Sequence, residues 1–200
     1  MNLVSGLGML LGGAWASGIN LYLTIMVLGI AGRLGVISLP GGLEVLMHPA
    51  VILIAALLFL VEFFADKIPY VDTTWDSVHT LVRPLGAGIL AYLGTSGSSE
   101  GAQFAFALLS GGVALDAHLT KATTRVAINT SPEPFSNIIA SVSKDALVLV
   151  ALWLVARHPV IAGIIVVSFI VFSIWFLKVM FRFLKRVFSF LSGEKKPEVS

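Results

Sequence analysis

The sequence predicts an all-α integral membrane protein with about six transmembrane helices, and three observations carry this prediction. Hydrophobic residues make up 57% of the 200 residues, whereas Asp, Glu, Lys and Arg together make up only 12%, about half the charged fraction of a soluble domain. The mean hydropathy is +0.96. Several apolar stretches approach or exceed the roughly 20 residues that a helix needs to cross a bilayer. The absence of cysteine also excludes disulfides and thiolate metal sites.

The elements follow from the apolar stretches taken in order. We expect helices over residues 3–32, 49–65, 75–94, 101–129, 135–156 and 159–177. The first carries no charged residue, and the second is interrupted by Glu62 alone. The third begins polar, so it is expected either to span the membrane or to re-enter it. The fourth is apolar first and polar later.

The basic residues near the C-terminus predict the orientation. Residues 1–177 form the predicted transmembrane domain, and residues 178–200 form a tail in which basic residues alternate with Phe and Leu. By the positive-inside rule this tail is cytoplasmic, and six spans then place both termini in the cytoplasm. The segment TSGSSEG, 95–101, is expected outside. This pattern predicts an amphipathic helix that lies along the anionic inner surface of the membrane.

Two similar segments suggest an internal repeat. LLGGAWASGINLYLT at 10–24 resembles LLSGGVALDAHLT at 108–120, which aligns Asn20 with Asp116 and Tyr22 with His118. With six spans the two halves would be inverted repeats of three helices each, with broken or re-entrant helices and a site at the midplane, as in many transporters. Close packing of glycine-rich helices is the alternative explanation.

Residues 62–84, EFFADKIPYVDTTWDSVHTLVRP, hold six of the 24 charged residues of the chain. Glu62 and Asp66 are four residues apart and share a helix face, and Asp76, His79 and Arg83 share a face of the next helix. A solvated loop with a capping box at Thr73 and Asp76 would be the plain alternative. It does not account for Glu62, His79 or Arg83 within apolar segments, where ionisable residues mark a pathway or a ligand site.

The helix over 101–129 is polar on two faces, with His118, Lys121 and Arg125 on one and Asp116 on the other, so it should lie inside the bundle. Lys144 and Asp145 follow on the next helix and either pair with this helix or contact a substrate. The predicted substrate- or ion-binding residues are Asn20, Tyr22, Glu62, Asp66, Lys67, Asp76, His79, Arg83, Asp116, His118, Lys121 and Arg125.

The segments ADKIPYVDTTWDSVHTLVRPLGA, GINLYLT and NTSPEPFSNIIASVSKD resemble DUF4126, a family of small polytopic bacterial membrane proteins of unknown function. The resemblance covers roughly residues 10–160. It implies a multi-spanning protein of the bacterial cytoplasmic membrane and supplies no functional residue.

Several functions fit these residues. We expect a transporter or channel for a small solute or ion. A translocase for a phosphorylated lipid or phosphate-bearing solute is the first alternative, since Arg33, Arg83, Lys121 and Arg125 could hold a phosphate. An intramembrane enzyme using a divalent cation is the second, with Glu62, Asp66, Asp76 and His79 as ligands. An enzyme is less favoured because no H-E-x-x-H, G-x-S-x-G or P-loop motif occurs.

A purely structural role also remains open. The expected partners are the lipid bilayer and a small solute, an ion or a phosphorylated lipid, with no nucleic acid. A second copy of the chain, in a homo-oligomer, is a further expected partner.

Overall fold

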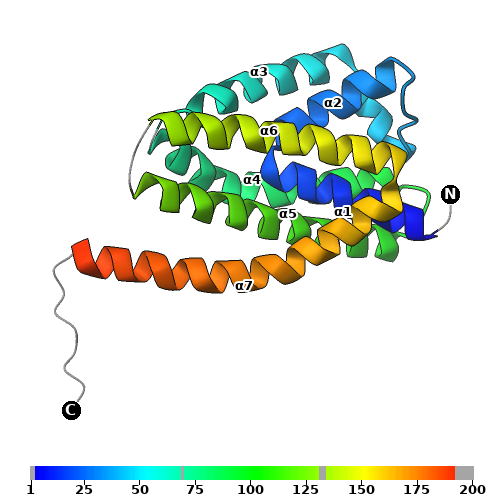
Figure 1. Cartoon of the computed structure of the whole chain (residues 1–200). Helices are drawn as coiled ribbons and strands as arrows, with labels where there is room; N and C mark the ends of the chain where they lie inside the picture. The colour runs from blue at the N-terminus through cyan, green and yellow to red at the C-terminus, as the bar shows by residue number, and fades with distance from the viewer. Residues whose placement is uncertain (1–2, 69, 131–133, 192–200) are drawn as a thin grey trace.

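The computed structural model describes residues 3–68, 70–130 and 134–191, and every regular element in these ranges is a helix (Figure 1). The elements are α1 (Leu3–Ile19), α2 (Leu21–Arg33), the 3-10 helix η1 (Gly41–Met47), α3 (Pro49–Ala65), α4 (Val71–Gly94), α5 (Glu100–Asn129), α6 (Pro134–Arg157) and α7 (Pro159–Leu191). The predicted all-α fold is therefore confirmed.

Three helices, α5, α6 and α7, are long and apolar enough to cross a membrane. A fourth crossing is obtained if η1 and α3, which meet at an angle of 71°, count as one broken span. The 24 residues of α4 extend for about 36 Å, but this helix carries Asp72, Asp76 and Arg83. Helices α1 and α2 are apolar and shorter.

The prediction of one helix over residues 3–32 is wrong, because the chain breaks at Asn20. This residue is extended, with φ −151° and ψ 97°, and its side-chain oxygen accepts a hydrogen bond from the backbone N–H of Leu23 at 3.0 Å. It thereby caps α2 and satisfies one of the free amides of a helix N-terminus. After the break α2 turns back beside the bundle (Figure 1). We call residues 3–33 the α1–α2 hairpin.

The long helices α3 to α7 run in alternating directions (Figure 1). We call the end of the bundle that holds Asp66 the Asp66 end, and the end that holds the turn after α4 the Ser98 end. Both outer ends of the hairpin lie at the Ser98 end, whereas α7 finishes at the Asp66 end (Figure 1). The first residues of α1 and the last residues of α7 therefore lie at opposite ends, which a bundle of six complete spans would not produce.

Helix α1 lies at the centre of the bundle, in contact with α4, α5, α6 and α7. A Cβ atom on Gly18 would overlap the backbone carbonyl oxygen of Ala114 on α5, so only glycine allows this approach. Ala16, Ala117 and Val148 belong to one buried apolar cluster of the bundle. The outer surface carries large apolar side chains such as Leu81 and Leu108, which are 72% and 78% exposed. This arrangement suits a lipid environment.

Two predicted boundaries differ from the structure. Helix α4 begins at Val71, not at 75, and its N-cap Tyr70 makes no capping hydrogen bond and has a positive φ of 69°. Thr73 and Asp76 therefore lie inside the helix, and the capping box is wrong. Helix α7 continues past residue 177 to Leu191, so Lys178, Arg182, Lys185 and Arg186 of the predicted tail belong to the last helix. Tail residues 192–200 lie outside the described part of the chain.

Candidate functional site

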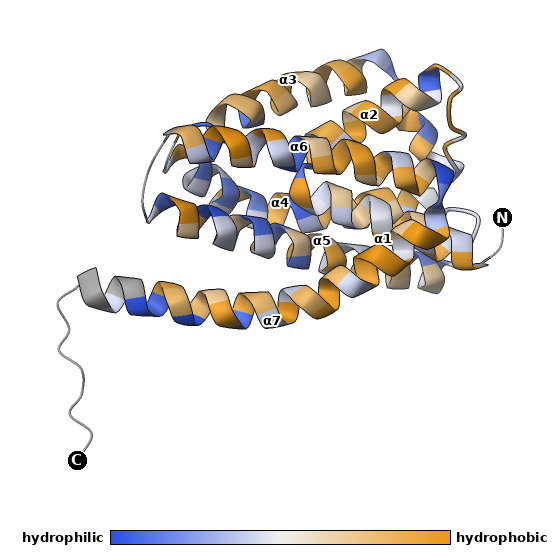
Figure 2. Cartoon of the chain, in the orientation of Figure 1, coloured by the Kyte–Doolittle hydropathy of each residue, from blue (hydrophilic) through white to orange (hydrophobic). Residues whose placement is uncertain are grey.

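Charged side chains converge inside the half of the bundle nearer the Asp66 end. They come from α3, the turn after it, α4, α5 and α6, and each is at most 8% exposed. We call the following nine residues the ionic network: Glu62, Asp66, Asp72, Asp76, Arg83, Lys121, Arg125, Lys144 and Asp145. Figure 2 shows hydrophilic residues along α4 and α5 toward this end.

Glu62 is the centre of the network. Its Oε1 lies 3.0 Å from Nη2 of Arg83 on α4 and 2.8 Å from Nζ of Lys144 on α6. Nζ of Lys121 on α5 is 3.7 Å from the same oxygen. One carboxylate on α3 therefore joins three other helices through charge-assisted contacts.

Asp76 and Asp66 share these cations with Glu62. Asp76 Oδ1 accepts a hydrogen bond from Lys121 Nζ at 2.8 Å and lies 3.4 Å from Arg83 Nη2. Asp66 Oδ2 is 2.7 Å from Lys144 Nζ. Asp76 is thus a buried ion-pair partner rather than a helix cap.

Arg125 forms the part of the network nearest the Asp66 end. Its Nη1 donates to the backbone carbonyl of Asp66 at 2.8 Å and to Oδ1 of Asn137 at 3.1 Å. The same nitrogen lies 3.6 Å from Asp72 Oδ2. The amide of Asn129 donates to Asp72 Oδ1 at 2.9 Å, so this part is both ionic and hydrogen-bonded.

At the middle of the bundle the network contacts the break in the α1–α2 hairpin. Arg83 Nη1 donates to the carbonyl of Gly18 at 3.2 Å, and Asn20 Nδ2 donates to Asp145 Oδ1 at 3.0 Å. The last carbonyls of a helix have no partner within it, and here one of them is satisfied by a guanidinium. The hairpin and the ionic network are therefore directly joined.

Two histidines border this junction. Nδ1 of His118 accepts a hydrogen bond from Arg83 Nη1 at 2.8 Å, which leaves its Nε2 to donate to Thr80 Oγ1 at 3.1 Å. Nδ1 of His79 donates to the carbonyl of Trp75 at 2.7 Å, so its Nε2 accepts from the hydroxyl of Tyr22 at 2.9 Å. The arginine donor holds His118 in one neutral tautomer, and the Trp75 carbonyl keeps a proton on Nδ1 of His79.

The network contains five carboxylates and four cations. Five carboxylate oxygens accept no hydrogen bond from the described part of the chain: Oε2 of Glu62, Oδ1 of Asp66, and Oδ2 of Asp72, Asp76 and Asp145. Two of these oxygens, Oδ1 of Asp66 and Oδ2 of Asp72, lie 3.6 Å from a cation. Buried oxygens without hydrogen bonds are costly, and they could accept a proton or contact a small cation.

The structure places most of the predicted site residues together. Glu62, Asp66, Asp76, Arg83, Lys121 and Arg125 belong to the network, and Asn20, Tyr22, His79 and His118 border it. Lys67 lies at its edge, where Nζ donates to the carbonyl of Phe63 at 2.9 Å and lies over the Phe63 ring. Burial lowers the pKa of Lys67.

Asp116 is separate from the other predicted residues. The hydroxyl of Ser173 on α7 donates to its carboxylate and lies 2.7 and 2.8 Å from the two oxygens. The internal repeat aligned Asp116 with Asn20, but the two residues make different contacts: Asn20 bonds to Asp145 and Asp116 bonds to Ser173.

Three members of the network, Asp72, Lys144 and Asp145, are absent from the predicted site. Lys144 pairs with Glu62, Asp66 and Asp145. The prediction that it pairs with the helix over 101–129, which is α5, is therefore wrong. A signal was present in the sequence, since Asn137, Ser141, Lys144 and Asp145 recur at helical spacing. All four side chains are buried.

The cations proposed to hold a phosphate are divided. Arg83, Lys121 and Arg125 already face carboxylates, whereas Arg33 is exposed at the end of α2, where Nη1 donates to the carbonyl of Met47 at 3.3 Å. Among residues 3–68, 70–130 and 134–191, no three His, Asp or Glu side chains are grouped to hold a metal ion. The arrangement thus adds no support for the divalent-cation site.

A family model described as "Domain of unknown function (DUF4126)" matches residues 7–179. The chain belongs to this family. No curated protein and no solved structure matches it. The match to DUF4126 includes residues 7–33 of the hairpin, every member of the ionic network and Ser173, so the whole site lies within the family domain.

Proposed function

We propose that this DUF4126 protein is a transporter for a small solute or ion, which moves through the polar half of the bundle. The buried ionic network carries this proposal. It lies inside a bundle whose outer surface is apolar, and it contains carboxylate oxygens without hydrogen-bond partners in the described chain. Ionisable residues within membrane segments are costly and usually mark an ion or substrate pathway.

The arrangement favours five membrane crossings, α3 to α7, with the α1–α2 hairpin re-entering from the Ser98 end. Exposed basic residues are concentrated in the last turns of α7 at the Asp66 end, including Lys178, Arg182 and Lys185. The positive-inside rule then makes this end cytoplasmic and places the N-terminus outside. Six complete spans, with both termini cytoplasmic, are the alternative. The three-plus-three inverted repeat gains no support, because α5 continues through Asp116 whereas the hairpin breaks at Asn20.

In this orientation the polar path begins at the cytoplasmic end and stops at the middle of the bundle. The α1–α2 hairpin fills the other half with small and apolar residues, among them Ala14, Ala16 and Leu23. Transport therefore requires the hairpin to move. Its contacts to Arg83 and Asp145 would transmit to it any change of charge in the ionic network.

The charges of the network indicate the kind of ion. Five buried carboxylates face four buried cations, and Lys67 contributes a further positive charge only from the edge. One proton or one monovalent cation would therefore balance the buried charge. We infer that such an ion is the transported species.

The proposal is tested by ion uptake into proteoliposomes. Proton uptake is followed with internal pyranine under a potassium diffusion potential, and sodium uptake with a sodium-sensitive dye. We expect one of the two to exceed uptake by empty liposomes several-fold, and Asp76→Asn to abolish most of this excess. Asp116→Asn is the matched control, because Asp116 lies outside the network, and it should keep normal uptake.

Thermal stability of the same variants separates transport from folding. If wild-type protein gives no uptake of either ion beyond that of empty liposomes, the ionic network is better explained as a structural element that holds four helices together. A stable Asp76→Asn variant with unchanged uptake would likewise contradict the proposed path.

A further inference from the structure

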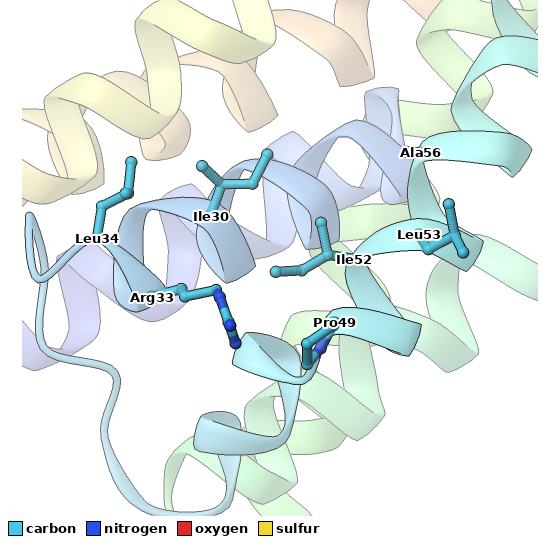
Figure 3. Close-up of a pocket in the computed structure, with 7 residues that line it drawn as sticks. All are labelled: Ile30, Arg33, Leu34, Pro49, Ile52, Leu53 and Ala56. Atoms are coloured by element: carbon cyan, nitrogen blue, oxygen red, sulfur yellow. The ribbon is translucent and has the colours of Figure 1, made fainter.

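A groove of about 380 Å³ lies between α2 and α3 near the Ser98 end (Figure 3). Its walls are apolar, with Ile30 and Leu34 on one side and Pro49, Ile52 and Leu53 on the other. Arg33 is the charged residue that lines it. The groove is separate from the ionic network and does not depend on the proposed function.

The guanidinium of Arg33 is only weakly engaged. Arg33 is exposed at the last residue of α2, and Nη1 donates to the carbonyl of Met47 at a distance of 3.3 Å. Among the described residues, no carboxylate forms an ion pair with Arg33. Most of the five N–H groups of this cation are thus available to an external acceptor.

The walls of the groove suit a hydrocarbon chain. Leu34 is 73% exposed and Leu53 is 60% exposed, so a large apolar area remains uncovered. An acyl chain placed between α2 and α3 would fill the groove and make close van der Waals contacts with these side chains. A negatively charged group at the end of that chain would match the cation beside the groove.

We propose that the groove binds one anionic phospholipid, with an acyl chain between α2 and α3 and the phosphate on Arg33. Arginine forms forked contacts with phosphate oxygens, and its charge favours an anionic headgroup over a zwitterionic one. The ligand class follows from this combination of one exposed guanidinium and an apolar groove. A second copy of the chain would leave the guanidinium without a matching anion unless it supplied a carboxylate.

Native mass spectrometry of the full-length protein tests this site. The protein is titrated with phosphatidylglycerol and with phosphatidylcholine of the same acyl chains. We expect one tightly held phosphatidylglycerol and a clear preference for it over phosphatidylcholine. Arg33→Gln should reduce this preference about fivefold, the size expected for one basic residue near an anionic lipid surface. Arg157→Gln, which removes an arginine from the last turn of α6, should leave it unchanged.

A second pair of variants tests the apolar part. Ala56→Phe places a larger side chain in the groove and should weaken the binding of both lipids. Leu57→Phe on the same helix should leave the binding of both lipids unchanged. Thermal unfolding verifies that the variants fold. Equal binding of both lipids to the wild type, or an unchanged preference in Arg33→Gln, would overturn the assignment. A dimer that Ala56→Phe disrupts would replace it with a protein–protein contact.

Discussion

At Glu62 one carboxylate is shared by cations from three helices. Removing a single partner from such a buried group leaves the others without compensation, and this loss commonly costs more than the intact pair contributes. The consequence for stability is asymmetric. Each cation around Glu62 has a second carboxylate nearby, Asp76 or Asp66, but Glu62 is common to all three.

We therefore expect Glu62→Gln to lower the free energy of unfolding by about 3 kcal/mol, the lower end of the range for breaking a buried ion pair. The amide keeps the shape of the side chain and removes its charge. Asp116→Asn is the control, since it changes a single hydrogen-bonded contact with Ser173 and should cost about 1 kcal/mol. Unfolding of the detergent-solubilised protein, followed by tryptophan fluorescence, measures both. Equal losses would show that Glu62 has no central role.

Much of the site could be predicted at this scale. Charged residues that recur at helical spacing in apolar segments identified Glu62, Asp76, Arg83 and Lys121, because such residues must face inward. The partners could not be predicted, since they depend on how the helices pack. Lys144 shows this clearly, as its ammonium reaches α3 rather than α5.

At the scale of the element, the α1–α2 hairpin is the main departure from the predicted fold. Residues 3–32 are uncharged and contain no proline, so the local sequence gives little reason for a break. The break depends on tertiary contacts: Asn20 caps α2 with its oxygen and donates to Asp145 with its nitrogen. The starts of α3 and α7 were predictable, because Pro49 and Pro159 stand at the first position of a helix.

Close packing of the hairpin provides an element-scale prediction. Gly18→Ala would place a Cβ atom against the carbonyl of Ala114 and force α1 away from α5. We expect a loss of about 1–3 kcal/mol, typical of overpacking. Gly13→Ala on the same helix meets no atom within 4 Å and should be neutral or slightly stabilising. Chemical unfolding of both variants measures the difference, and equal stability would contradict the observed contact.

The hairpin should also depend on its cap. Asn20→Ala removes the hydrogen bond to the N–H of Leu23 and leaves Asp145 without its amide donor. Loss of a cap costs about 1 kcal/mol, and loss of a hydrogen bond to a charged group costs about 1.5–3 kcal/mol. Hydrogen exchange of residues 14–24 should rise in this variant, while exchange in α7 should change little. Uniform exchange throughout the bundle would instead indicate global destabilisation.

At the scale of the whole molecule, the direction of α1 decides the topology. Single cysteines can be introduced without background because the chain has none. A membrane-impermeant maleimide applied to intact cells should label Val4→Cys and Val36→Cys, which replace residues exposed at the Ser98 end. It should also label Ser98→Cys and fail at Ser192→Cys. Protection of Val4→Cys, with labelling at Val36→Cys, would favour six complete spans.

The central position of α1 has a consequence for biogenesis. Ribosomes make α1 before α7, yet Gly8 on α1 lies against the backbone of Pro159 at the start of α7. The hairpin therefore cannot reach its final contacts until α7 has left the ribosome. Until then this glycine-rich segment lacks the contacts that hold it at the centre of the bundle. Emergence of α7, rather than insertion of the α1–α2 hairpin, is the step that closes the bundle.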